Sequence, residues 1–212
     1  MMALLLNIVA LCILIATWVN DNWRMLRRSR LLQHLLFGSA AIISFIWLFS
    51  AKLEQGLSVH FLLITTVTLM LGFRYALLAG VAIIAINGLY SSYPITSVGA
   101  LYLSHIVIPA AVTYVAYAVI YHRLPRHPFI YIFLNAFLAA AIAIAATHLA
   151  HAAWALTTET LTTKQVWENY LVITPLVMFP EALLNGMAVT LMVVYRPNWL
   201  VTFNDEQYID PN

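Results

Sequence analysis

Charged side chains are scarce in this sequence of 212 residues: aspartate, glutamate, lysine and arginine together make up 8%, whereas hydrophobic residues make up 63%. The mean hydropathy is +0.89. A soluble domain of this length exposes a large part of its surface and could not hide so much apolar surface from water. The composition therefore predicts an integral membrane protein that is solvated mainly by membrane lipid.

Other absences exclude further classes of protein. The single cysteine, Cys12, rules out an internal disulfide and a metal cage built from several thiolates. The formal net charge of +2, without a basic cluster interleaved with aromatics, argues against nucleic acid as a partner. The sequence contains no phosphate-binding glycine loop, no Ser/His/Asp order and no His-Glu-x-x-His signature. An ATP-driven step would therefore need another subunit.

Apolar stretches of membrane-spanning length recur along the chain, with charged or turn-rich breaks between them. The first lacks the basic start and cleavage site of a signal peptide, so we interpret it as a retained helix. The pattern predicts an all-α integral membrane protein with about seven transmembrane helices. The predicted segments are residues 3–19, 31–51, 59–73, 76–92, 99–121, 128–152 and 170–195.

Arginine is confined to alternate breaks between these segments. The breaks after the first, third, fifth and seventh segments hold Arg24, Arg27, Arg28 and Arg30, then Arg74, then Arg123 and Arg126, and finally Arg196. Because cytoplasmic loops carry an excess of positive charge, this alternation predicts an outside N-terminus and a cytoplasmic C-terminus. We expect one transmembrane domain over residues 1–197 and a short cytoplasmic tail over 198–212.

Small residues cluster in the sixth predicted helix, at Ala136, Ala140, Ala143 and Ala146. Such a surface lets helix backbones approach closely in lipid, where packing drives association. The surface could serve internal packing or a partner subunit.

Glu181 follows Pro180 near the middle of the last predicted helix. A charge at that depth is unfavourable, so such residues face a cavity, a partner or a pathway. Glu181 is therefore a candidate for a substrate or proton pathway. The alternative is a hydrogen-bonded carboxyl that fixes helix packing.

Four of the seven histidines are candidates for chemistry. His60 follows Gly56-Leu57-Ser58-Val59 at the start of the third segment, and His105 lies about a turn and a half inside the fifth. Imidazole is a common ligand for borderline metals, but an interfacial histidine that bonds a loop carbonyl is the plainer interpretation of His60 alone. His148 and His151 share a helix face at a spacing that can hold a metal, but two interfacial histidines beside Trp154 are more often simply hydrated, so the pair is a weak signal.

The residues from Gly56 onward resemble the CbiM/NikM family, the substrate-binding membrane components of energy-coupling factor importers for cobalt and nickel. Gly56-Leu57-Ser58-Val59-His60 resembles the family's Gly-Thr-Ser-x-His element, and Ile95-Thr96-Ser97-Val98-Gly99-Ala100 resembles its Thr-x-x-Gly-Ala-Asn turn. Leu71-Gly72-Phe73, Ala76-Leu77-Leu78-Ala79-Gly80 and Glu181-Ala182-Leu183-Leu184-Asn185-Gly186 continue the likeness in the same order. The resemblance spans roughly residues 56–197.

The resemblance implies a metal site made of the free N-terminal amine, a histidine at position two and the histidine that corresponds to His60. This chain begins Met1-Met2, however, and Leu101 replaces the asparagine of the Gly-Ala-Asn turn. Met2 could offer a thioether suited to Cu(I), and His105 could supply a replacement imidazole. We therefore expect Met1, Met2, His60 and His105 as candidate metal ligands.

Three hypotheses follow from the sequence. The first is a permease component of an energy-coupling factor importer in a prokaryotic plasma or inner membrane. It has no catalytic activity or permanently bound cofactor, carries a transition-metal ion as substrate, and works with a coupling transmembrane subunit and ATPase subunits. The second is a membrane assembly or interaction protein that keeps the fold without transport. The third, an intramembrane enzyme that uses Glu181 with a histidine, lacks an accompanying nucleophile or paired acid.

Overall fold

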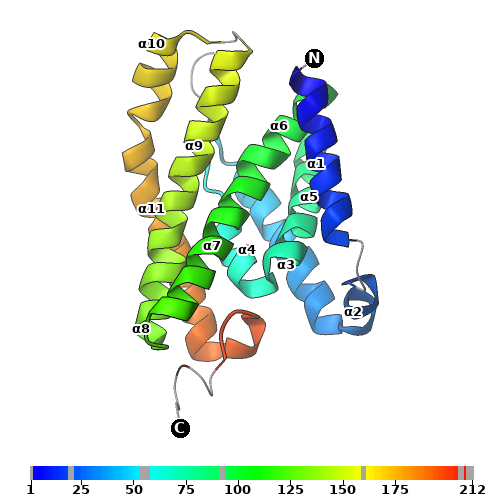
Figure 1. The fold of residues 1–212 in the computed structure, drawn as a ribbon, viewed down its shortest axis with the longest axis vertical. Coiled ribbons are helices and arrows are strands. Elements are labelled where there is room, and N and C mark those ends of the chain that lie inside the picture. The colour runs from blue at the N-terminus through cyan, green and yellow to red at the C-terminus, as the bar shows by residue number, and fades with distance from the viewer. Residues whose placement is uncertain are drawn as a thin grey trace.

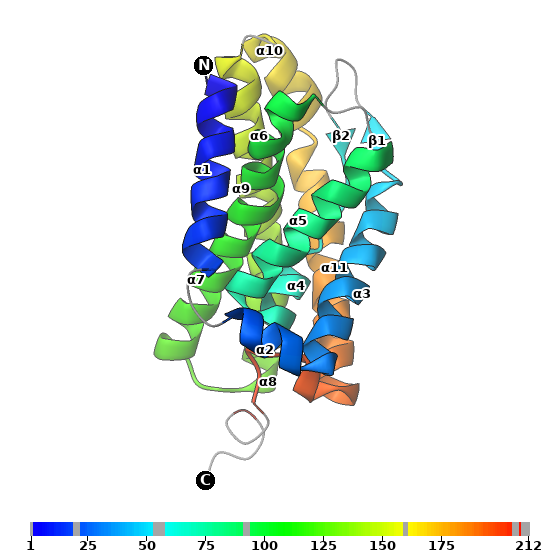
Figure 2. The same ribbon diagram turned by 90° about the vertical axis from the view of Figure 1, so that its right-hand side faces the viewer.

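The computed structural model describes residues 2–18, 22–52, 58–90, 94–158, 161–204 and 208. These residues form a bundle of helices that run roughly along one axis, with α10 at one end and α2 and α8 at the other (Figures 1 and 2). The main helices are α1 (Met2–Trp18), α2 (Asn22–Arg28), α3 (Arg30–Trp47), α4 (Ile64–Leu71), α5 (Phe73–Tyr90), α6 (Val98–Tyr102), α7 (Ile108–Arg123), α8 (Pro128–Ile130), α9 (Ala139–Thr157), α10 (Thr163–Val166) and α11 (Thr174–Tyr195).

Shorter elements join or interrupt these helices. Two-residue strands β1 (Ala51–Lys52) and β2 (Ser58–Val59) pair antiparallel before α4. Three π-helical segments and two 3-10 turns complete the described elements. The π-helical segments are η3 (Leu103–Val107), η4 (Tyr131–Leu138) and η5 (Trp167–Leu171), and the 3-10 turns are η2 (Ile95–Ser97) and η6 (Pro197–Trp199).

Five helical stretches in the described residues are long and apolar enough to cross a bilayer. They are Arg30–Trp47, Phe73–Tyr90, Val98–Arg123, Pro128–Thr157 and Thr174–Tyr195, and α1 is a shorter apolar helix of 17 residues. The structure thus confirms a helical, multi-pass membrane protein. The number of seven crossings and the outside N-terminus stay predictions.

The helix predicted over residues 59–73 is much shorter in the structure. Helix α4 has only eight residues, about 12 Å of helix, whereas the hydrocarbon core of a bilayer is about 30 Å thick. Leu63 precedes it at φ 55°, and Gly72 ends it at φ 78°, where a residue without Cβ is favoured. Seven of the eight residues are buried, so protein rather than lipid surrounds them. Hydropathy cannot distinguish these two apolar surroundings.

Large apolar side chains cover much of the outer surface of the bundle. Leu176 is 75% exposed and Phe37 is 62% exposed. Such a surface would promote aggregation in water but is the favourable surface in lipid. Lipid therefore solvates the helices that the protein core does not enclose.

The small residues of η4 and α9 lie inside the bundle. Ala136, Ala140 and Ala143 are all buried, and α9 packs against α7 and α11. These alanines therefore allow helices of the same chain to pack closely against one another. Of the two interpretations left open by the sequence, internal packing is the one that the structure supports for these three positions.

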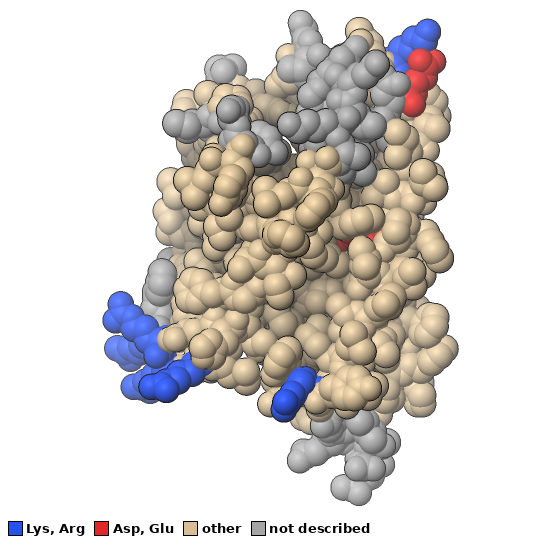
Figure 3. Space-filling view, turned by 180° about the vertical axis from the view of Figure 1, so that it is seen from behind, with Lys and Arg blue, Asp and Glu red and all other residues tan. Residues whose placement is uncertain are grey.

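Charged groups lie mainly at the two ends of the bundle. On the face shown in Figure 3, lysine and arginine gather mostly at one end, and a lysine beside an acidic residue marks the other. Arg24, Arg27 and Arg28 belong to α2, which lies across the first of these ends. This separation agrees with the arginine pattern on which the predicted orientation depends.

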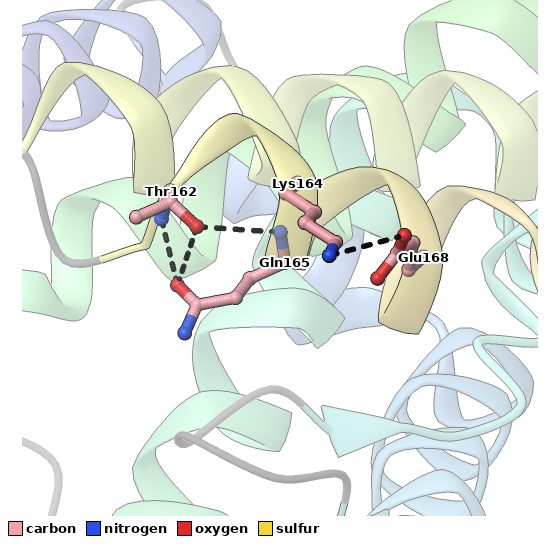
Figure 4. Close-up of polar contacts among 4 residues, drawn as sticks. All are labelled: Thr162, Lys164, Gln165 and Glu168. Carbon is pink, nitrogen blue, oxygen red and sulfur yellow. Dashed lines mark hydrogen bonds and ion pairs between the residues drawn. The ribbon is translucent and has the colours of Figure 1, made fainter.

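A capping box begins α10 at the opposite end of the bundle. The Gln165 side chain accepts a hydrogen bond from the Thr162 backbone N–H at 2.8 Å, and Thr162 Oγ1 accepts from the Gln165 N–H at 3.4 Å (Figure 4). Lys164 and Glu168 form an exposed ion pair at 4.0 Å. The capping box satisfies orphan N–H groups of the helix start and fixes the turn that leads toward α11.

Helices α1 and α6 approach each other closely at Gly99. The Gly99 N–H donates to Asn7 Oδ1 at 2.6 Å, so a side chain of α1 caps the start of α6. A Cβ at position 99 would lie 2.6 Å from the backbone N and Cα of Asn7. Only glycine fits this contact without moving α1.

We expect Gly99→Ala to destabilise the protein by about 1–3 kcal/mol, because the added methyl group forces two helix backbones apart. The measurement is the thermal unfolding midpoint in detergent. Gly88→Ala is the matched control, since a Cβ there meets nothing within 4 Å. Equal midpoints for the two variants would contradict the close contact between α1 and α6.

Candidate functional site

The N-terminus of α4 is buried and is satisfied by a side chain from α11. The Leu62 and Leu63 backbone N–H groups donate to the two carboxylate oxygens of Glu181 at 2.9 and 2.8 Å. Glu181 is only 2% exposed. A helix start carries unpaired N–H groups and a partial positive charge, so an acidic side chain there is stabilising.

Asn185, one helical turn after Glu181, extends this arrangement. Its Oδ1 accepts from the Thr66 N–H at 2.9 Å and from Thr66 Oγ1 at 2.7 Å. Its Nδ2 donates to Glu181 Oε1 at 2.8 Å. Two side chains at i and i+4 of α11 therefore bind the first turn of α4 and one another.

The C-terminal end of α4 is satisfied by the segment that follows α11. Thr202 Oγ1 donates to the Leu69 carbonyl at 2.7 Å and shares a 2.6 Å hydrogen bond with the Tyr131 hydroxyl. The Val201 N–H donates to the Met70 carbonyl at 3.2 Å. The described part of the predicted tail thus packs on the helical bundle, while the domain boundary at residue 197 stays a prediction.

These hydrogen bonds bear on the two interpretations of Glu181. Both carboxylate oxygens already accept hydrogen bonds from the protein, which supports a role in helix packing. The role of Glu181 in a substrate pathway stays a prediction. The carboxyl group also fixes the chain at residues 62 and 63, immediately after His60.

His60 is placed in the segment between β2 and α4. Both of its ring nitrogens are buried and have no hydrogen-bond partner among the described residues. The Trp47 ring of α3 lies against it, with ring centroids 4.5 Å apart. The loop-carbonyl partner expected from the plainer interpretation is thus absent from the part of the chain that the structure describes.

His105 stacks directly on His60. Their ring centroids are 5.3 Å apart and their planes differ by only 6°. His105 is buried within the π-helical segment η3, and its Nδ1 lies 2.8 Å from Ser104 Oγ. Single π-turns within helices frequently mark functional sites. The structure therefore brings together two of the predicted metal ligands.

His151 of α9 also contacts this pair, through His105. Its ring meets His105 edge-on, with centroids 5.2 Å apart and planes at 88°. His148, one turn earlier, is 3% exposed and its Nδ1 lies 2.8 Å from Thr174 Oγ1. The wet-interface interpretation of this pair is wrong for His148, which is buried. The small residues Ala140, Ala143 and Thr147 of the same buried face could have indicated this placement.

The N-terminal ligands are not joined to this cluster by any described contact. Met2 is the first residue of α1 and is 45% exposed. Met1 lies outside the described residues. Metal binding by Met1 and Met2 stays a prediction.

In the described residues, no three histidine, cysteine or acidic side chains are arranged around a common metal position. The reason is visible in the ring geometry. Lone pairs of imidazole nitrogens lie in the ring plane, and the planes of His60 and His105 are parallel. The cluster therefore supplies imidazoles at close range, and coordination of one ion needs a rotation of side chains.

The fold and the site define the class of this protein: it is a polytopic helical membrane protein with imidazoles buried among its helices. A family model described as "CbiM: Cobalt uptake substrate-specific transmembrane region" matches residues 1–199, and the chain belongs to this family. The protein is thus a membrane component of metal-ion transport, of a family that works within transporter complexes. No curated protein and no solved structure matches the chain.

We expect Glu181→Gln to lower the free energy of unfolding by about 1–3 kcal/mol, because the amide NH₂ would face a backbone N–H where an acceptor is needed. Thermal unfolding in detergent measures the loss. Leu176→Ala on the exposed face of α11 is the control and should change the midpoint little. If Glu181→Gln unfolds like the wild type but abolishes transport, Glu181 acts in the pathway and not in packing.

Proposed function

We propose that this protein is the substrate-binding permease component of an energy-coupling factor ABC importer for a transition-metal ion. The observation that carries the proposal is the stacked pair of His60 and His105 in a chain of the CbiM family. Imidazole nitrogen suits borderline divalent ions such as cobalt, nickel, copper and zinc. The family description favours cobalt among these.

Energy for transport comes from partners on this proposal. The sequence carries no phosphate-binding loop, so ATPase subunits supply the hydrolysis and a coupling transmembrane subunit transmits it. The complex resides in a prokaryotic plasma or inner membrane. The chain binds the ion as cargo, without catalysis and without a permanently held cofactor.

In an alternative form of the proposal the ion is a soft metal such as Cu(I), and the start of the chain supplies ligands. Met1 and Met2 would supply thioether or amine groups beside His60, and thioether sulfur favours Cu(I) over the borderline divalent ions. Binding of Cu(I) that depends on Met2 would distinguish this donor set from an imidazole site.

A second candidate function is a membrane assembly or interaction protein that keeps this fold without transport. It is favoured by the absence of a histidine at position two and by the exposure of Met2. Co-purification separates the two functions. A transporter brings ATPase and coupling subunits, whereas an assembly protein brings a different membrane complex.

We expect the purified protein to bind Co²⁺ or Ni²⁺, and His60→Ala to weaken this binding by at least about 100-fold, because it removes a direct ligand. Equilibrium dialysis with elemental analysis measures the bound metal. His122→Ala is the control, because His122 is an exposed histidine at the end of α7. Absence of metal binding by the wild type would overturn the metal proposal.

A further inference from the structure

Three imidazoles from distant parts of the sequence meet inside the bundle: His60 before α4, His105 in η3 and His151 in α9. We propose that these three side chains form the metal-binding site, with His151 as the third imidazole beside His60 and His105. The assignment deepens the proposed transport function and rests on it.

The nitrogens of His60 are available for a metal. Both are buried without a hydrogen-bond partner among the described residues, which is an unfavourable state for polar atoms inside a protein. A coordinate bond to an ion satisfies one of them. Rotation of this ring breaks no hydrogen bond within the described part of the chain.

The environment of His105 fixes which of its nitrogens is available. Ser104 Oγ lies 2.8 Å from the Ala100 carbonyl and 2.8 Å from His105 Nδ1. The hydroxyl has one hydrogen, and the carbonyl can only accept, so the hydroxyl donates to Ala100 and accepts from Nδ1–H. Nε2 therefore carries the lone pair. A ligand histidine whose other nitrogen donates to a neighbouring group is the usual arrangement at metal sites.

His151 completes the set through its orientation. Its ring is nearly perpendicular to that of His105, at 88°, so its in-plane nitrogens are directed differently from those of the stacked pair. The parallel pair must open for three nitrogens to converge on one ion, and rotation of His60 provides this. Trp47 covers the cluster from α3, with its ring 4.5 Å from His60 and 6.1 Å from His105.

The chemistry of the donor set selects the ion. Three neutral imidazoles suit borderline divalent ions, whereas Mg²⁺ and Ca²⁺ require oxygen ligands. The three ligands carry no negative charge to balance the bound ion, and a charge without such balance is poorly stabilised in apolar surroundings.

The test compares His151→Ala with His148→Ala in the full-length protein. His148 lies one turn away on the same helix, and its Nδ1 is engaged with Thr174, which makes it the matched control. The probe is Co²⁺, with affinity measured by equilibrium dialysis and ligand geometry by visible absorption. We expect His60→Ala to weaken Co²⁺ binding at least about 100-fold, His105→Ala and His151→Ala each to weaken it at least about 10-fold, and His148→Ala to change it less than about 3-fold.

The outcomes separate the inference from the proposed function. If His60→Ala abolishes binding while His151→Ala binds like the wild type, the third-ligand assignment is overturned and the transport proposal stands. If Met2→Ala loses Co²⁺ binding and His151→Ala keeps it, the site lies at the N-terminus, and the assignment of His151 as third ligand is overturned. If the wild type binds no Co²⁺, the transport proposal itself fails.

If the His151→Ala variant does not fold, a second measurement on the wild type tests the assignment. X-ray absorption at the cobalt edge of the loaded wild type counts imidazoles from their multiple-scattering pattern. Three imidazoles support the assignment, and two or fewer overturn it.

Discussion

The structure depends on the hydrogen bonds between Glu181 and Asn185 of α11 and the first turn of α4. An eight-residue helix that starts inside an apolar bundle exposes unpaired N–H groups where water is scarce, which is unfavourable unless protein groups bind them. Glu181 and Asn185 bind them at one end, and Thr202 binds a carbonyl at the other. Without these partners a short buried helix at this depth would be unstable.

The same hydrogen bonds also position the histidine cluster. Glu181 holds the backbone at Leu62 and Leu63, and so it fixes the segment that carries His60. The segment that carries His60 is therefore positioned by α11. A shift of this helix would change the spacing of the imidazoles.

The sequence predicted most helices, because long apolar segments between arginine-bearing breaks correspond closely to α1, α3, α5, α7, α9 and α11. It failed at α4, since burial in protein and burial in lipid select the same residues. His60 and His105 could be singled out as imidazoles in apolar segments. The contact of His105 with His151 could not be predicted, because it depends on how segments far apart in the sequence pack together, and the π-turn at His105 has no recognised signal in residue spacing.

The partners of α4 also determine when it can fold. Its N-terminal groups bind a residue 119 positions later in the chain, and its Leu69 carbonyl binds one 133 positions later. During synthesis the earlier helices are already in place before these partners leave the ribosome. Helix α4 and the loop that carries His60 therefore reach their final arrangement only in the nearly completed chain, and a nascent or truncated product has no finished histidine cluster.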